Sequence, residues 1–288
     1  VEDARWGARL QDRVFKDALI HGLYAGSHFV NYPNDGIGDF PDEYYRGKPY
    51  IMGLTAEFIA QKYGFTREQQ DEVALRSHNE AERANVEGIF SDEIVPVSIK
   101  TRKGEVLFAK DEHFKQNLTM DQLAAMPPAF IPKTGTVTAG NASGINDGAA
   151  ALVIMAEDKA IELGITPLAR IGGIGMGACA PYYMGESPIP AVNDLLKRSG
   201  ISLDLFDRIE VNEAFASQYL AVEKELGLNR EITNVHGSGI GLGHPVGCTG
   251  ARIMVTLLYE LIHSQKTHGL ATLCGGGGVS EAVYLERL

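Results

Sequence analysis

The stretch DRIEVNEAFASQYLAVEKELG, residues 207–227, contains both kinds of element that decide the fold. Its first part has the apolar and β-branched residues of a buried strand, and the remainder has the composition of a helix. Asn212 and Glu213 stand where the strand passes directly into the helix. A strand that leads at once into a helix is the repeating unit of layered α/β proteins, and the stretch therefore predicts that class.

The same alternation continues on both sides of this stretch. The predicted strands cover 168–177, 207–213, 231–237, 268–275 and 280–288, and the predicted helices cover 188–200, 214–227 and 244–265. Strand and helix thus alternate three times and end in a strand pair, a βαβαβαββ series over residues 167–288. This order predicts an α/β fold built on a layered sheet.

The first 135 residues are less regular. The patterns predict helices over 54–64 and 65–88 and strands over 93–99 and 104–110. In the second helix, Thr66 and Gln69 have the spacing of a capping box, which marks a helix start. An unusual insert near residues 26–49 is rich in Gly, Pro, Asp and Tyr and is typical of a long loop. Residues 1–135 therefore form a mixed domain without one periodic core.

A further strand is predicted over Ala149–Met155, which has the sequence AAALVIM. Its residues are apolar on both faces, which is typical of a strand inside a sheet. The residues before it contain no set of strand–helix units that could pair with it. Either this strand joins the C-terminal sheet, or its natural partners are not in this chain.

Composition and charge exclude several classes of function. The chain is 44% hydrophobic and 22% charged, as expected of a globular protein, and its formal net charge is −11. An acidic chain is a poor match for nucleic acid or an anionic membrane. Its three cysteines are an odd number at wide spacing, which favours a reducing compartment over a disulfide framework. With a polar, charged start and no signal-peptide pattern, we expect a cytoplasmic protein.

Glycine clusters suggest a nucleotide site, but their spacing does not fit one. In GSGIGLGHP, the sixth position from Gly237 is Leu242 and the sixth position from Gly239 is His244, so the dinucleotide motif fails. A P-loop is absent too, and an NAD-dependent enzyme becomes a remote alternative. No CxxC occurs, and the pair His244 and Cys248 lacks two further ligands, so we expect no metal site.

Three polar or reactive residues follow three predicted strands. Asn212 ends one strand, His244 follows the next, and Cys274 ends the third, just before four glycines. In open α/β sheets the loops at the carboxyl ends of strands gather in one crevice, where these side chains would meet. Each residue also has a simpler interpretation: Asn212 as a helix N-cap, His244 as a loop residue and Cys274 as a small buried apolar residue.

These three motifs, NEAF, GHP and CGG, together with TVTAGNASGINDGAAALVIM at 136–155, resemble the thiolase family in their order and spacing. The resemblance implies a thiolase-like layered α/β fold in which residues 1–135 are the lid domain. Residues 136–166 would be a remnant of the N-terminal half, and residues 167–288 the C-terminal half. The N-terminal half would be incomplete, without the segment that carries the family's nucleophilic cysteine.

The resemblance also implies catalytic roles. His244 would be the base that makes the nucleophile a thiolate, and its place near a helix start would keep it neutral. Cys274 would be a second acid or base. Asn212 would hold a water that forms one oxyanion hole with His244, and the Gly276 N–H would contribute to another. For substrate binding, the resemblance points to Met52, Lys115, Ala139, Ser143, Ala214 and Phe215.

The function implied is that of an acyltransferase that cleaves a 3-ketoacyl-CoA or condenses acyl-CoAs. Coenzyme A is then a substrate and product, and no tightly bound cofactor is expected. Because none of the three cysteines has the nucleophile's context, we expect another polypeptide or a cleaved segment to supply it, in a homo- or hetero-oligomer. The alternative is a non-catalytic subunit that binds acyl-CoA or acts as a scaffold.

Overall fold

The computed structural model describes residues 52–288, so the insert near 26–49 and the rest of residues 1–51 lie outside the described part. In the first part, the elements are α4 (Met52–Tyr63), α5 (Arg67–Glu87), β1 (Val97–Thr101), β2 (Gly104–Phe108), α6 (Met120–Ala124) and α7 (Glu157–Leu163). In the second part, they are β3 (Ala169–Ala178), α8 (Pro188–Ser199), β4 (Arg208–Val211), α9 (Ala216–Leu226), α10 (Gly239–Leu242), α11 (Thr249–His263), β5 (His268–Gly275) and β6 (Val279–Arg287). Short 3-10 helices cover Ile89–Asp92, Pro181–Glu186 and Leu203–Leu205.

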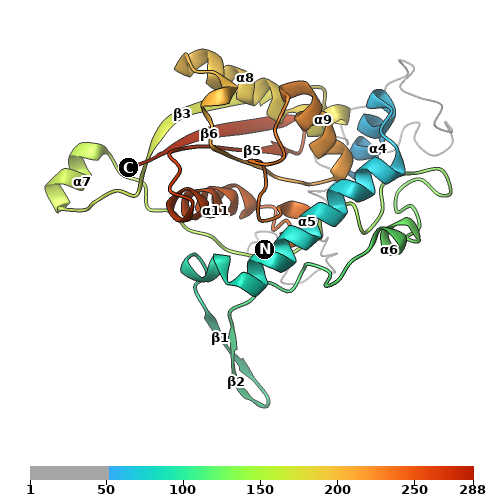
Figure 1. Cartoon of the computed structure of the whole chain (residues 1–288), viewed down its shortest axis with the longest axis horizontal. Coiled ribbons are helices and arrows are strands. Elements are labelled where there is room, and N and C mark those ends of the chain that lie inside the picture. Colours follow the sequence, from blue (N-terminus) through green and yellow to red (C-terminus); the bar gives the residue numbers. More distant parts are fainter. Residues whose placement is uncertain (1–51) are drawn as a thin grey trace, which may run out of the picture.

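The second part forms a layered α/β unit around a sheet with the order β3-β6-β5-β4. Strands β4 and β5 are parallel, and β6 is antiparallel to both β3 and β5. Helix α8 lies on one side of the sheet and α11 on the other (Figure 1). Along β5, Leu270 packs in a cluster with Val192 of α8, while the next residue, Ala271, packs with Leu257 of α11. Successive strand residues point to opposite faces, so each face of the sheet is covered by its own helix.

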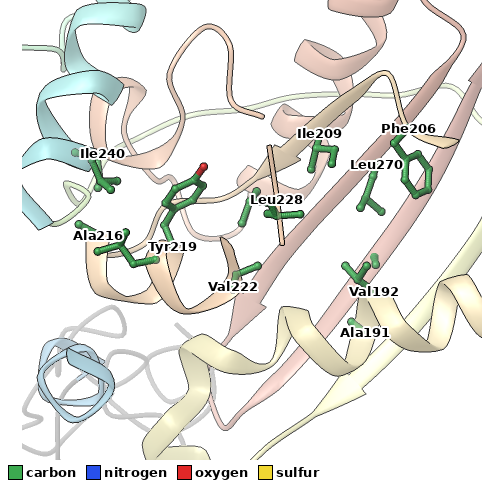
Figure 2. Packing of buried hydrophobic residues seen from close by; sticks show 14 of the residues in the cluster. Ala191, Val192, Phe206, Ile209, Ala216, Tyr219, Val222, Leu228, Ile240 and Leu270 are labelled. Carbon is green, nitrogen blue, oxygen red and sulfur yellow. The ribbon is translucent and has the colours of Figure 1, made fainter. Parts of the chain in front are cut away.

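The larger apolar cluster fills the space between the sheet and helices α8 and α9. Val192, Ile209, Tyr219 and Leu270 all belong to this cluster (Figure 2), and each is at most 2% exposed. Burial of a side chain of this size stabilises the fold by roughly 1.5–3 kcal/mol relative to exposure. This cluster packs β4 and the first part of β5 against helices α8 and α9.

The first part packs against the helices that follow β4. Helix α5 begins with the predicted capping box of Thr66 and Gln69 and ends at Gly88, which has a φ of 73°. Beside it, the buried carboxylate of Glu57 in α4 accepts hydrogen bonds from the main-chain N–H groups of Thr136 and Val137, each at 3.0 Å. This anchor fixes the start of the 136–150 loop. None of the helices between residues 52 and 288 has the length and hydrophobicity needed to cross a membrane.

The strand predicted over Ala149–Met155 does not form. These residues belong to no strand and pair with no other strand in the described part of the chain. Val153 is 88% exposed and Ile154 is 67% exposed. The possibility that this segment joins the C-terminal sheet is therefore wrong, because the sheet ends at β3 on one side and β4 on the other.

The strand predicted over 231–237 is reduced to isolated bridges. Thr233 pairs with Ile209 at the edge of β4, but Asn234 has a φ of 50°, which breaks an extended strand. The Asn234 side chain replaces the lost ladder: its Oδ1 accepts from the Val211 N–H at 2.8 Å and its Nδ2 donates to the Val211 carbonyl at 2.9 Å. A side-chain amide therefore does here what a strand's main chain would do.

The helix predicted from residue 244 begins later than expected. Helix α11 starts at Thr249, and residues 245–248 form a turn in which the N–H groups of Cys248 and Thr249 both donate to the Pro245 carbonyl. Pro245 therefore opens a turn rather than the first turn of the helix.

Candidate active site

Asn212 lies directly after β4, at the carboxyl edge of the sheet. Its main-chain N–H donates to the Thr272 carbonyl of β5 at 3.0 Å, and the residue is fully buried. Helix α9 has Phe215 as its N-cap residue, so Asn212 does not cap it. The Oδ1 atom of Asn212 is buried without a hydrogen-bond partner among the described residues. A buried amide oxygen of this kind suits a donor from a water molecule or a ligand.

His244 lies beside Asn212, with the Asn212 Nδ2 atom 3.5 Å from both ring nitrogens. The Nδ1 atom of His244 is 2.6 Å from the Thr249 hydroxyl oxygen, and that hydroxyl donates to the Pro245 carbonyl at 3.0 Å. Because the carbonyl takes the hydroxyl proton, the hydroxyl oxygen accepts from Nδ1. Nδ1 therefore carries the imidazole proton, and the unprotonated Nε2, which lies near the Asn212 amide nitrogen, has the lone pair that can accept a proton.

The imidazole of His244 is neutral at pH 7. Burial, and after it the positive charge of Arg252, lowers its pKa to about 4. The sequence-based argument attributed neutrality to a helix start at His244, but α11 begins five residues later. The imidazole is neutral as expected, but the cause is burial and the nearby Arg252 guanidinium rather than a helix start.

Cys274, near the end of β5, lies in a small apolar cluster. Met184 and Ala214 are its buried neighbours, and the partly buried side chains of Met52 and Phe215 pack against them. Burial raises the pKa of the Cys274 thiol to about 12, so this thiol keeps its proton at neutral pH. Four of the residues predicted for the site are thus brought together from three distant parts of the chain.

The segment from Asn212 to Ala214 joins the imidazole side of the site to the thiol side. Asn212 contacts His244, and Ala214 packs against Cys274. The segment follows β4, and Cys274 lies in the parallel neighbour β5. These contacts bring Asn212 next to His244 and Ala214 next to Cys274 at the end of β4.

The glycines after Cys274 form the turn between β5 and β6. Gly277 and Gly278 both have a φ of 85°, a conformation that favours glycine. A Cβ atom on Gly278 would also lie 2.5 Å from the Cys179 carbonyl oxygen. Gly276 is exposed at this turn, and without a side chain its main chain is accessible next to Cys274.

Ala139 and Ser143 lie on the loop that runs along the start of α9. The Ser143 N–H donates to the Ala214 carbonyl, and the Ala216 N–H donates to the Asn141 carbonyl, at 3.0 and 2.9 Å. This short antiparallel pairing places Ser143 against the Asn212–Ala214 segment. Ala139 is exposed farther along the same loop.

Lys115 lies next to two histidines. Its main-chain N–H donates to Nδ1 of His78 at 3.3 Å, and the rings of His78 and His113 are 6.3 Å apart. Burial, followed by the charge of Lys115, lowers the pKa of His78 to about 4. Burial also lowers the pKa of the Lys115 ammonium group.

A pocket of about 520 Å³ opens beside His244. Residues 145–150 line one wall and residues 244–248, with Ala251, line the other. Among its lining residues, Ile145 and Val246 are 63% and 53% exposed. Among residues 52–288, no cluster of three or more His, Cys, Asp or Glu side chains is arranged to hold a metal ion.

Sequence reasoning missed two residues that contact His244. Thr249 fixes the imidazole tautomer, and Asn146 accepts the His244 main-chain N–H at 3.1 Å. Thr249 could have been found from the sequence, because its hydroxyl lies only five residues after the candidate base His244. Asn146 is separated from His244 by 98 positions, and nothing in the local pattern connects them.

Comparison with known proteins places the chain among related sequences and structures. The family model "Thiolase, N-terminal domain" matches residues 41–158, and "Thiolase, C-terminal domain" matches residues 165–287. An acetyl-CoA acetyltransferase of Escherichia coli (strain K12) is 54% identical over 286 residues, which are 99% of this chain and 67% of that protein. The crystal structure of the Bacillus anthracis acetyl-CoA acetyltransferase is 48% identical with a TM-score of 0.85, covering 99% of this chain and 67% of that one. Human mitochondrial 3-ketoacyl-CoA thiolase in complex with CoA is 43% identical with a TM-score of 0.79, covering 83% and 60%.

The match to the N-terminal model corrects one expectation. Residues 41–158 match that domain, so the chain covers part of the N-terminal domain as well as the C-terminal one. The chain spans between 61% and 68% of the length of the curated relatives it matches. The solved relatives confirm the predicted thiolase-like α/β fold.

Proposed function

The chain belongs to the thiolase family, and from this premise we propose that it carries the imidazole, the amide and one thiol of an acyl-CoA acyltransferase. The reaction is the thiolytic cleavage of a 3-ketoacyl-CoA or the reverse condensation of two acyl-CoAs. The observation that carries the proposal is the joint placement of His244 and Cys274 against the Asn212–Ala214 segment. The imidazole of His244 contacts one end of this segment, and the protonated thiol of Cys274 packs against the other end.

His244 and Cys274 have opposite protonation states, as proton transfer requires. In thiolysis, a nucleophilic cysteine thiol gives its proton to Nε2 of His244 and its sulfur attacks the 3-keto carbon. The bond to the α-carbon breaks, and the α-carbon takes the Cys274 proton, which releases the shorter CoA ester. The Cys274 thiolate then takes the proton of a second CoA thiol, whose sulfur attacks the enzyme-bound acyl group. The departing cysteine sulfur recovers its proton from His244.

Negative charge on the substrate oxygens requires hydrogen-bond donors. The unpartnered Oδ1 of Asn212 suits a water that, with His244, stabilises one oxyanion. The accessible main-chain N–H of Gly276, with the N–H of the nucleophilic cysteine, serves a second oxyanion. Neither arrangement needs a tightly bound cofactor, because coenzyme A enters as substrate and leaves as product.

The remaining predicted residues line the path of coenzyme A in this proposal. Met52, Ala214 and Phe215 surround the acyl end beside Cys274, a role supported by their shared apolar cluster. Ser143 and Ala139 line the pantetheine channel, and Lys115 attracts a nucleotide phosphate. A human thiolase relative has been solved in complex with CoA, which supports this ligand class.

The nucleophilic cysteine comes from a second polypeptide or a separately carried segment, in an oligomer. The three cysteines of this chain support this view because each has a raised pKa: Cys274 about 12, Cys179 about 11, and Cys248 in the same direction, all chiefly through burial. A nucleophile needs the opposite shift. The pocket between residues 145–150 and 244–248 adjoins His244 and offers space for that segment. The widely spaced cysteines also favour a cytoplasmic site of action.

The test is a mixing experiment. The chain is combined with a candidate partner that has a Cys-Gly segment after a βαβ pattern, and the loss of a 3-ketoacyl-CoA is followed. We expect turnover in the mixture, a fall of about 10²–10⁴-fold in Cys274→Ala, and CoA affinity within about twofold of the parent chain. Cys179→Ala is the matched control, a thiol removed without loss of rate.

Each other outcome has a definite meaning. Full turnover by the purified chain alone contradicts the second polypeptide. CoA binding by every mixture tested, with no cleavage in any, favours the non-catalytic alternative, a subunit that binds acyl-CoA or acts as a scaffold.

A further inference from the structure

Two side chains that the proposed chemistry does not use hold the main chain of His244. The His244 N–H donates to Asn146 Oδ1 at 3.1 Å. On its other side, Asn146 Nδ2 is 3.2 Å from Nδ1 of His113. A side-chain amide has one accepting end and one donating end, so these two contacts determine which way Asn146 faces. Nδ1 of His113 must therefore accept.

His113 is fixed in its turn. With Nδ1 accepting from Asn146, the proton lies on the other ring nitrogen, and the Ile240 carbonyl provides a hydrogen-bond acceptor for the His113 ring. Ile240 belongs to α10, which directly precedes Gly243 and His244. His113 and Asn146 thus hold this part of the chain at two points, the Ile240 carbonyl and the His244 amide. Burial, followed by the charge of Lys115, lowers the pKa of His113 and favours the neutral, accepting ring.

Gly243 shows how closely Asn146 approaches the main chain. Its φ is 93°, and a Cβ atom at this position would lie 2.6 Å from Asn146 Oδ1 and 2.7 Å from its Cγ. Ile145 also forms a parallel bridge with His244. Residues 145–146 and 243–244 therefore run side by side, and a shift of Asn146 would move the main chain that carries the imidazole.

We propose that Asn146, oriented by His113, is a positioning residue that sets the direction in which Nε2 of His244 faces the reacting thiol. This inference rests on the proposed role of His244 as the base. It goes beyond that role because it assigns a function to His113 and Asn146, which hold the main chain of His244. Displacements of about 1 Å at a reacting group can reduce the rate by about 100-fold, so such a contact has a measurable effect.

The test uses the full chain labelled with ¹⁵N-histidine, with NMR as the readout of each ring's tautomer. In the parent chain we expect His244 as a single Nδ1–H tautomer and His113 as a single Nε2–H tautomer. Asn146→Ala should shift and broaden the His244 ring signals, because the main chain that carries the ring loses its hydrogen bond and the ring moves relative to Thr249. In the mixing assay it should lower kcat by about 10- to 100-fold, with KM for the CoA substrate within twofold.

Asn146→Asp is a second, more conservative variant, which separates loss of the Asn146 contacts from poor folding of Asn146→Ala. Its carboxylate still accepts the His244 N–H but offers His113 no donor, so Nδ1 of His113 should become protonated while His244 keeps its parent tautomer. Asn229→Ala, which removes an exposed amide that accepts only a local N–H from Glu231, is the matched control and should change neither ring.

The proposal is overturned if Asn146→Ala leaves the His244 signals as in the parent chain. It is equally overturned if Asn146→Asp leaves His113 in the Nε2–H form. The NMR measurements need no turnover. A parent mixture without cleavage would count against the proposed function alone, while the ring signals would still decide the role of Asn146.

Discussion

Strand β5 and the segment Ala149–Met155 are both apolar runs, yet they have opposite fates. In β5, Leu270 is fully buried, with β4 paired on one edge, β6 on the other, and helices on both faces. In the segment, Val153 is 88% exposed, and no strand of the described chain pairs with it. The residue types are similar, so the difference lies in the partners. An apolar run becomes a buried strand only where both its edges and its faces meet other parts of the molecule.

The largest expected contrast is in stability. Leu270→Ala removes a fully buried side chain from the main cluster and should lower the free energy of unfolding by about 2–5 kcal/mol. Val153→Ala removes an exposed one and should change it by no more than about 0.5 kcal/mol. Urea denaturation measures the free energy of unfolding of both variants and of the parent chain. Equal losses would mean that the segment is buried in solution, and the comparison would fail.

A second contrast is in pH dependence, because the buried sheet also contains a carboxyl group. Burial, opposed in part by Arg252, raises the pKa of Glu210 from its ordinary value of 4.5 to about 8. The folded state thus keeps this proton after the unfolded state has released it. The resulting stability is complete below about pH 4.5 and is lost as the pH rises toward 8.

Glu210→Gln keeps the size of the side chain but cannot titrate. Between pH 6.5 and 8, the variant should lose a slope of up to about 1.4 kcal/mol per pH unit in the free energy of unfolding. A smaller slope should remain, since burial also raises the pKa of Glu93, to about 7. Urea titrations of parent and variant at four pH values in this window measure how the free energy of unfolding depends on pH. Parallel curves for parent and variant would contradict the prediction.

The third contrast concerns association and has the smallest expected effect. Ile154 is 67% exposed and lies four residues after Ala150, the last residue of this segment that lines the pocket beside His244. Ile154→Asp should leave the chain's own stability within about 0.5 kcal/mol. It should weaken binding of the partner that we propose to carry the nucleophile by about tenfold, or about 1.4 kcal/mol. Titration calorimetry provides the measurement, with Val106→Asp on the distant hairpin β1–β2 as the control for surface charge. Unchanged affinity in Ile154→Asp would place the partner elsewhere.

The C-terminal order of elements could be predicted from local patterns. Alternating strands and helices, the capping box at Thr66 and the glycine turn after Cys274 all depend on neighbours within a few residues. The convergence of Asn212 and Cys274 could also be predicted, since parallel strands end at the same edge of a sheet. The strand over 231–237 could not, because a left-handed Asn234 replaces its ladder with side-chain hydrogen bonds.

The sequence by itself determined most strands and helices of residues 167–288 and which reactive residues follow strands, because periodicity and capping act over a few residues. The tertiary structure decided which apolar runs are buried, as β5 and the 149–155 segment show. It also decided the chemical state of the site. His244 is neutral because it is buried near Arg252, and its main chain is held by Asn146, far away in sequence. Burial and hydrogen bonding between distant residues exist only once the chain has folded, and they set the pKa values and orientations on which proton transfer depends.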